Sequence, residues 1–122
     1  MEWNEVSKKI DEKIKVGTKI PKTDGSAREV TKIKGNKIQM RVGVETEAKK
    51  YTTKEMVKFA FEIINSGEFF ASDKLKSKFQ QEYNQGPCVF SMTGGVLEFI
   101  GIVKCIPNPN GRGFAYISIN EK

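Results

Sequence analysis

The chain has no histidine among its 122 residues, and it has only two cysteines and one tryptophan. Without histidine, the commonest general base at neutral pH and a preferred zinc ligand are both missing. Cys88 and Cys105 match no zinc-binding spacing, and neither has a histidine to activate it as a nucleophile. We therefore expect no metal, no cofactor and no enzymatic activity. We interpret both cysteines as small buried hydrophobic residues.

The sequence also lacks long apolar runs. None approaches the roughly 18 residues that a membrane span requires, and the first residues have neither the basic start nor the apolar stretch of a secretion signal. We expect a cytoplasmic protein with no membrane partner. The content of 38% hydrophobic and 30% charged residues is typical of a folded chain, and 122 residues make one ordinary domain.

Negative charge is in short supply. The net charge is +6 and the isoelectric point is near 9.3, which favours an anionic partner such as nucleic acid or an acidic protein. Residues 1–50 carry 13 Lys and Arg against 8 Asp and Glu, whereas residues 51–122 carry 8 against 7. The excess of positive charge is therefore concentrated in the N-terminal part of the chain.

The N-terminal part reads as a helix followed by a small antiparallel sheet. Apolar residues at helical spacing predict a helix over 3–14, and short strands are expected near 18–20 and 49–52. Alternating segments 28–34 and 37–42 flank a Gly-Asn link, a good hairpin signal. The register stays open, because Val30 and Ile33 do not share parity. Two readings of the hairpin cations remain equal: an anion-binding surface, or a charged edge that discourages aggregation. These cations are Lys32, Lys34, Lys37 and Arg41.

The C-terminal part predicts three helices and two late strands. A capping box formed by Thr52 and Glu55 opens a helix to about residue 65, and its mostly apolar circumference suggests that it is sandwiched inside the fold. A short strand over 68–70 precedes a helix capped by Ser72. A third helix runs from Pro87 to Gly101, followed by strands over 102–106 and 114–119 around a turn-rich loop.

This order of elements resembles a winged helix-turn-helix over residues 53–119. We expect an α+β fold in which an N-terminal helix and antiparallel sheet (1–52) pack on a winged-helix unit (53–122), forming one cooperative domain. The resemblance implies that the third helix enters the major groove and that the wing touches the DNA backbone. By position, Ser91, Thr93 and Gln85 would face bases, Arg112 with Asn108 and Asn110 would form the wing contact, and Lys74 and Lys78 would meet phosphates.

The third helix lacks the side chains that read bases well. Between Pro87 and Phe99 there is no Arg, Lys, Asn or Gln. We therefore expect a non-enzymatic accessory or regulatory protein that binds duplex DNA mainly through phosphate contacts. The alternative is a winged-helix protein–protein interaction module, which an exposed Phe90 or Met92 would favour. Gly94 and Gly95 serve either close helix packing or the approach of a partner's backbone. The oligomeric state is open, a homodimer included.

Overall fold

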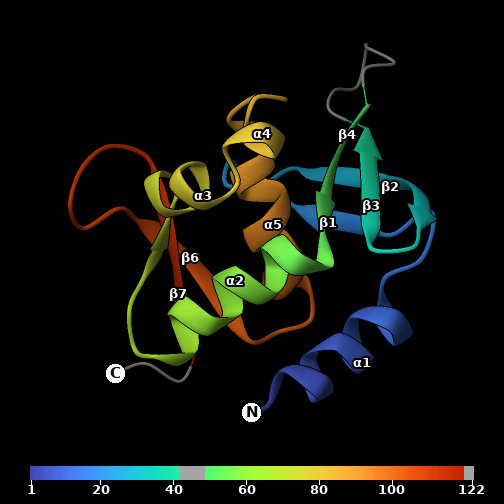
Figure 1. The fold of residues 1–122 in the computed structure, drawn as a ribbon, viewed down its shortest axis with the longest axis horizontal. Coiled ribbons are helices and arrows are strands. Elements are labelled where there is room, and N and C mark those ends of the chain that lie inside the picture. Colours follow the sequence, from blue (N-terminus) through green and yellow to red (C-terminus); the bar gives the residue numbers. More distant parts are fainter. Residues whose placement is uncertain (42–48, 120–122) are drawn as a thin grey trace.

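The computed structural model describes residues 1–41 and 49–119, whose strands form two antiparallel sheets with helices packed against them (Figure 1). The elements in chain order are α1 (Trp3–Lys13), β1 (Lys19–Pro21), β2 (Ala27–Lys34), β3 (Lys37–Arg41), β4 (Lys49–Thr53), α2 (Lys54–Asn65), β5 (Phe70–Ala71), α3 (Ser72–Lys78), α4 (Gln80–Tyr83), α5 (Cys88–Phe99), β6 (Val103–Pro107) and β7 (Phe114–Ser118). The expected α+β class is confirmed.

The N-terminal sheet has the strand order β1-β2-β3-β4, each strand antiparallel to its neighbour. The expected hairpin over β2 and β3 is confirmed, and Gly35 takes the positive φ of 58° that a tight turn requires. The expected strand near 49–52 is also confirmed, as β4. Val42, placed at the end of the hairpin by its sequence pattern, lies outside the described residues.

A β-bulge in β2 resolves the register that the sequence left open. Val30 pairs with Met40, but Lys32 pairs with Gln39, so that Thr31 is the extra residue. Because side chains alternate between the two faces of a strand, the extra residue returns Ile33 to the side of Val30. Lys32 and Lys34 therefore lie on the opposite side, away from the core.

The C-terminal sheet has the order β5-β7-β6, again antiparallel. The short strand β5 pairs with β7, where Phe70 lies opposite Tyr116. Strands β6 and β7 form a hairpin around the Pro- and Gly-rich loop that the sequence indicated. Both side chains of the Phe70–Tyr116 pair are fully buried against the helices.

Helix α5 lies between the two sheets, in the middle of the molecule (Figure 1). It contacts β1 and β4 on one side and β6 on the other, and all of its residues from Val89 to Leu97 are buried. The sequence had placed α2 in this central position. Helix α2 does bury one face, but its residues Lys58, Glu62 and Asn65 remain exposed. One hydrophobic core runs through both expected units.

The adjacent glycines of α5 serve helix packing, the first of their two interpretations. A methyl group on Gly94 would overlap the ring of Tyr116 on β7. A methyl group on Gly95 would lie 2.7 Å from the carbonyl oxygen of Pro21 on β1. The partners are therefore the two sheets, one on each side of α5, whereas the sequence had suggested α2.

Three local expectations were wrong. Ser72 does not cap α3: it is the first residue of that helix, and Ala71 is at the N-cap position with no side-chain hydrogen bond. Helix α2 is capped by Thr53, whose hydroxyl accepts a hydrogen bond from the Met56 amide, and not by Thr52. The segment after Ser72 is two short helices, because Phe79 leaves the helical conformation with φ −125° and ψ 52°. The Phe79 ring packs edge-on against Phe59 of α2, at 5.6 Å between centroids, which compensates for the interrupted helix.

Candidate nucleic-acid interface

The side chains expected to face DNA bases lie inside the protein. Ser91 is 7% exposed, and its hydroxyl accepts a hydrogen bond from Arg28 and donates one to the Cys88 carbonyl. Thr93 is fully buried; its hydroxyl is hydrogen bonded to that of Thr52 at 2.7 Å and donates to the Val89 carbonyl. We correct the sequence interpretation at both positions, because the N-terminal sheet covers the helix that was expected to be exposed.

The two apolar residues of α5 named as contacts for a protein partner are covered as well. Phe90 is 7% exposed and Met92 is fully buried. The Phe90 ring lies between those of Phe70 and Tyr116, with centroid distances of 5.2 and 5.3 Å. Helix α5 therefore offers neither a base-reading edge nor an apolar stripe for a protein partner.

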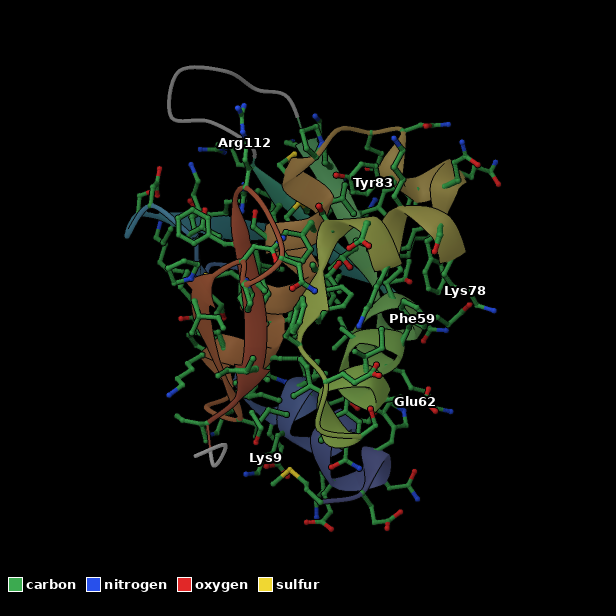
Figure 2. The ribbon with its side chains drawn as sticks, turned by 90° about the vertical axis from the view of Figure 1, so that its left-hand side faces the viewer. Lys9, Phe59, Glu62, Lys78, Tyr83 and Arg112 are labelled. Atoms are coloured by element: carbon green, nitrogen blue, oxygen red, sulfur yellow. The ribbon has the colours of Figure 1, made fainter. Side chains whose placement is uncertain are left out.

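The remaining candidates around the wing do not gather in one place. Lys74 already has partners within the protein. Its ammonium group donates a hydrogen bond to the Phe69 carbonyl at 3.0 Å and forms an ion pair with Glu68 at 3.4 Å. Lys78 and Arg112 are exposed, and Figure 2 shows them on different sides of the molecule. Isolated cations of this kind can each meet one phosphate, but they do not form a continuous basic surface.

Three polar residues named from the winged-helix resemblance have structural roles. The Gln85 side chain bridges the backbone of Tyr51, accepting from its amide and donating to its carbonyl. Asn108 and Asn110 bond within the loop between β6 and β7, where the Asn108 side chain accepts from the Asn110 amide and donates to the Arg112 carbonyl. Gln85 thus ties the turn before α5 to β4.

The largest gathering of cations lies on the outer face of the N-terminal sheet, which we call the basic face. The inward residues of β3 and β4 are Ile38, Met40 and Thr52, all buried. Alternation and register place the basic face on the opposite side. Its members are Lys32, Lys34, Lys37, Gln39, Arg41, Lys49 and Tyr51.

Cations sit directly opposite one another on this face. Lys34 pairs with Lys37 across β2 and β3, and Arg41 pairs with Lys49 across β3 and β4. Like charges in cross-strand pairs are destabilising, and no carboxylate of a described residue forms an ion pair with any of the four. The arrangement lowers stability slightly and keeps several cations available to an anion.

Tyr51 and Gln39 lie among these cations. The Lys37 ammonium group lies 4.6 Å from the centroid of the Tyr51 ring. Gln39 is cross-strand neighbour to both Lys32 and Tyr51. The hairpin cations of this face were found from the sequence, but Gln39, Lys49 and Tyr51 were missed. The buried alternation of Ile38 and Met40 was the signal that could have placed Gln39 beside them.

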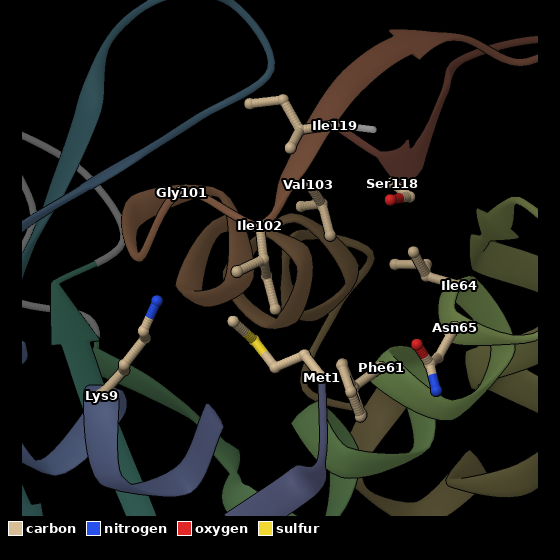
Figure 3. A pocket seen from close by; sticks show the side chains of 10 residues that line it. All are labelled: Met1, Lys9, Phe61, Ile64, Asn65, Gly101, Ile102, Val103, Ser118 and Ile119. Carbon is tan, nitrogen blue, oxygen red and sulfur yellow. The ribbon is translucent and has the colours of Figure 1, made fainter. Parts of the chain in front are cut away.

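The described residues give little support for thiol chemistry or metal binding. Both cysteines are free and half-buried, and burial with the nearby Glu98 carboxylate raises the pKa of the Cys105 thiol to about 11. Within residues 1–41 and 49–119 no group of three metal-ligating side chains converges. A hollow of about 310 Å³ between α1, α2 and β6 is lined mostly by apolar side chains, with Lys9 at its margin (Figure 3).

Comparison of the chain with protein-family models, with curated proteins and with solved structures finds no match. Among the described residues, no helix combines the length and apolar character needed to cross a bilayer.

Proposed function

We propose that this protein binds nucleic acid, most simply duplex DNA, through phosphate contacts made by the basic face. The observation that carries the proposal is the register of β2, β3 and β4, which puts Lys32, Lys34, Lys37, Arg41 and Lys49 on one surface. Such contacts are independent of base sequence and are driven by the release of counterions.

The size of the basic face suits several simultaneous contacts. Lys37 and Arg41 are four residues apart on β3, which corresponds to about 13 Å. Duplex DNA carries one charge per roughly 1.7 Å of its axis, so a segment of this length carries about eight phosphates around its circumference. One side of the duplex can therefore present several phosphates to the five cations.

We also propose that residues 53–119 form a winged-helix scaffold with a structural third helix. The order α2, β5, α3, α4, α5, β6, β7 and the pairing of β5 with β7 support it. The split between α3 and α4 departs from the expected pattern. In this proposal the N-terminal sheet takes over the binding role, and α5 holds that sheet in place.

The test is the salt dependence of binding to a mixed-sequence DNA duplex, followed by fluorescence anisotropy. We expect measurable binding at 50 mM salt that weakens steeply toward 200 mM, with a slope reduced by about one for each cation removed. Lys37→Ala and Arg41→Ala are the variants; Lys104→Ala, an exposed lysine on β6, is the matched control. Absence of binding at low salt, or equal loss in the control, would contradict the proposal.

An acidic protein segment is the alternative occupant of the same basic face. It would compete with DNA and share the salt dependence, since both present closely spaced negative charges. Competition by polyglutamate at equal charge concentration separates them. Duplex DNA should displace polyglutamate more readily than the reverse if nucleic acid is the partner.

A further inference from the structure

Arg28 is a buried cation without an ion-pair partner among the described residues. It lies on the inner side of β2 and is 6% exposed. Its Nη1 donates to the Ser91 hydroxyl at 2.9 Å, whereas its Nε is buried with no hydrogen-bond partner. Burial lowers the pKa of the Arg28 guanidinium. A buried charge normally persists only when it is neutralised and fully hydrogen bonded.

The groups around Arg28 do not neutralise it. Cys88 and Tyr116 interact with it electrostatically, and the Tyr116 hydroxyl is itself buried without a partner. The carboxylate that acts on Arg28 belongs to Asp24, which is exposed, accepts hydrogen bonds from Ser26 and pairs with Lys22 at 3.9 Å. The residues that the structure describes thus leave a positive charge in place beside α5 without supplying its anion.

A pocket of about 200 Å³ has Ser91, the hydrogen-bond partner of Arg28, among its lining residues. The other polar or charged residues that line it are Thr23, Ser72, Tyr83 and Arg112. Its remaining residues include Phe90 and Phe114, and none of the lining residues is acidic. Ser91 therefore links a pocket that contains one arginine to a second, buried arginine.

We propose that this pocket binds a phosphate group. Arg112, in the exposed loop between β6 and β7, contacts the phosphate from outside, and the hydroxyls of Thr23, Ser72 and Ser91 donate to its oxygens. Arg28 supplies a second positive charge through Ser91, whose hydroxyl turns its hydrogen from the Cys88 carbonyl toward the ligand. Several donors and two guanidinium groups match the several acceptor oxygens of a tetrahedral oxyanion.

This site is separate from the basic face and does not depend on the proposed function. Arg28 points inward from β2, whereas Lys32 and Lys34 point outward after the bulge at Thr31. The phosphate group has two sources with the same chemistry: free phosphate, or the terminal phosphate of a nucleic-acid strand.

The first experiment measures thermal unfolding in inorganic phosphate and in chloride at matched ionic strength and pH. A ligand that binds only the folded state raises Tm with its concentration. We expect phosphate, and not chloride, to raise the Tm of the unaltered protein by a few degrees. An equal Tm in the two salts would overturn the proposal.

Variants locate the effect. Arg112→Ala and Ser91→Ala should reduce the phosphate-specific rise in Tm, and Arg28→Met should abolish it. Lys104→Ala, exposed on the neighbouring β6, should keep it in full. Arg112 is exposed, so its variant tests the pocket even where Arg28→Met fails to fold. A phosphate-specific rise that survives Arg112→Ala and Ser91→Ala would place binding elsewhere and overturn the proposal.

The second experiment compares oligonucleotides that carry a 5′-phosphate or a 5′-hydroxyl, labelled at the other end. Tighter binding of the phosphorylated strand by about tenfold, lost in Arg112→Ala, would identify the strand terminus as the source. Equal binding of both strands, with the phosphate-specific Tm rise intact, identifies free phosphate. Both oligonucleotides are annealed to a complement, and failure of both duplexes to bind would sink the proposed function while the phosphate site stands.

Discussion

The two sheets on either side of α5 differ sharply in charge. The strands of the C-terminal sheet, β5, β6 and β7, contain one charged residue, Lys104. The strands of the N-terminal sheet contain one acidic residue, Glu29, among many lysines and arginines. Both sheets bury an apolar face against the same helix. This difference in charge shows that a sheet can pack on α5 without cations. Their concentration on the N-terminal sheet therefore needs a separate explanation.

The largest expected effect tests whether the two sheets are one unit. Gly94→Ala and Gly95→Ala each force a methyl group against one sheet, Tyr116 on one side and Pro21 on the other. Overpacking of a buried helix costs about 1–3 kcal/mol, and the rigid ring makes Gly94→Ala the more severe. Urea denaturation followed by circular dichroism should show a single transition at lower midpoint in both variants.

Gly111→Ala is the matched control, because an added methyl would lie 3.9 Å from the nearest atom, in an exposed loop. Two separate transitions in Gly95→Ala would contradict the expectation that the two sheets unfold together. In that case the N-terminal sheet would unfold independently of the C-terminal sheet, and α5 would not couple them.

A smaller effect is expected at the hydroxyl pair that joins β4 to α5. Thr93→Val removes the partner of the buried Thr52 hydroxyl, leaving Thr52 only a 3.8 Å contact with the Met56 sulfur. We expect the free energy of unfolding to fall by about 1–2 kcal/mol. Thr52→Val combined with Thr93→Val should cost less than the two single variants added together, as a double-mutant cycle in urea would measure. Strict additivity would mean that the bond does not help attach the sheet.

A smaller effect with the opposite sign is expected on the basic face. Lys34→Glu replaces a like-charge pair with Lys37 by an opposite-charge pair, which should stabilise the fold by about 0.2–1 kcal/mol. The same variant should weaken DNA binding, because it removes one cation and adds an anion. Denaturation and anisotropy on one preparation test both. A variant that is both less stable and equally competent in binding would contradict our account of the charge difference.

The last prediction involves the smallest change to the fold and concerns the access of water to Cys105, on the inner side of the C-terminal sheet. With a pKa of about 11, against 9.0 for an ordinary thiol, Cys105 remains protonated at pH 8. Its thiolate fraction should be about one hundredfold lower than that of an ordinary thiol. Iodoacetamide labelling of Cys105 in a Cys88→Ser variant should be correspondingly slow and should accelerate as the pH rises toward 11. Labelling at the rate of a free thiol would show that this side of the sheet admits water.

Local sequence signals predicted the fold class and most of the elements. The Gly-Asn turn, the alternation of β3 and the final hairpin were all readable, because each depends on neighbouring residues. The central position of α5 was not. It depends on contacts between residues far apart, such as Gly95 with Pro21 and Thr93 with Thr52.

The site predictions divided for the same reason. Lys32, Lys34, Lys37 and Arg41 could be grouped from the sequence because they lie in one hairpin. Lys49 and Tyr51 join the same face only through the pairing of β3 with β4, a strand that is not part of that hairpin. Ser91 and Thr93 were misplaced because the resemblance to a winged helix implied an exposed start of the third helix. Nothing near them in the sequence indicates the sheet that covers them.

The bulge at Thr31 decides which side of β2 carries charge. If Thr31 were paired regularly, strict alternation after Val30 would turn Lys32 and Lys34 toward the core and Ile33 outward. Deleting Thr31 would instead leave those lysines outward, because Val30 and Lys32 would then follow one another opposite Met40 and Gln39. The cation-rich exterior of this sheet therefore tolerates the loss of that one codon, whereas a change that regularised the pairing at full length would remove it without altering any charged residue.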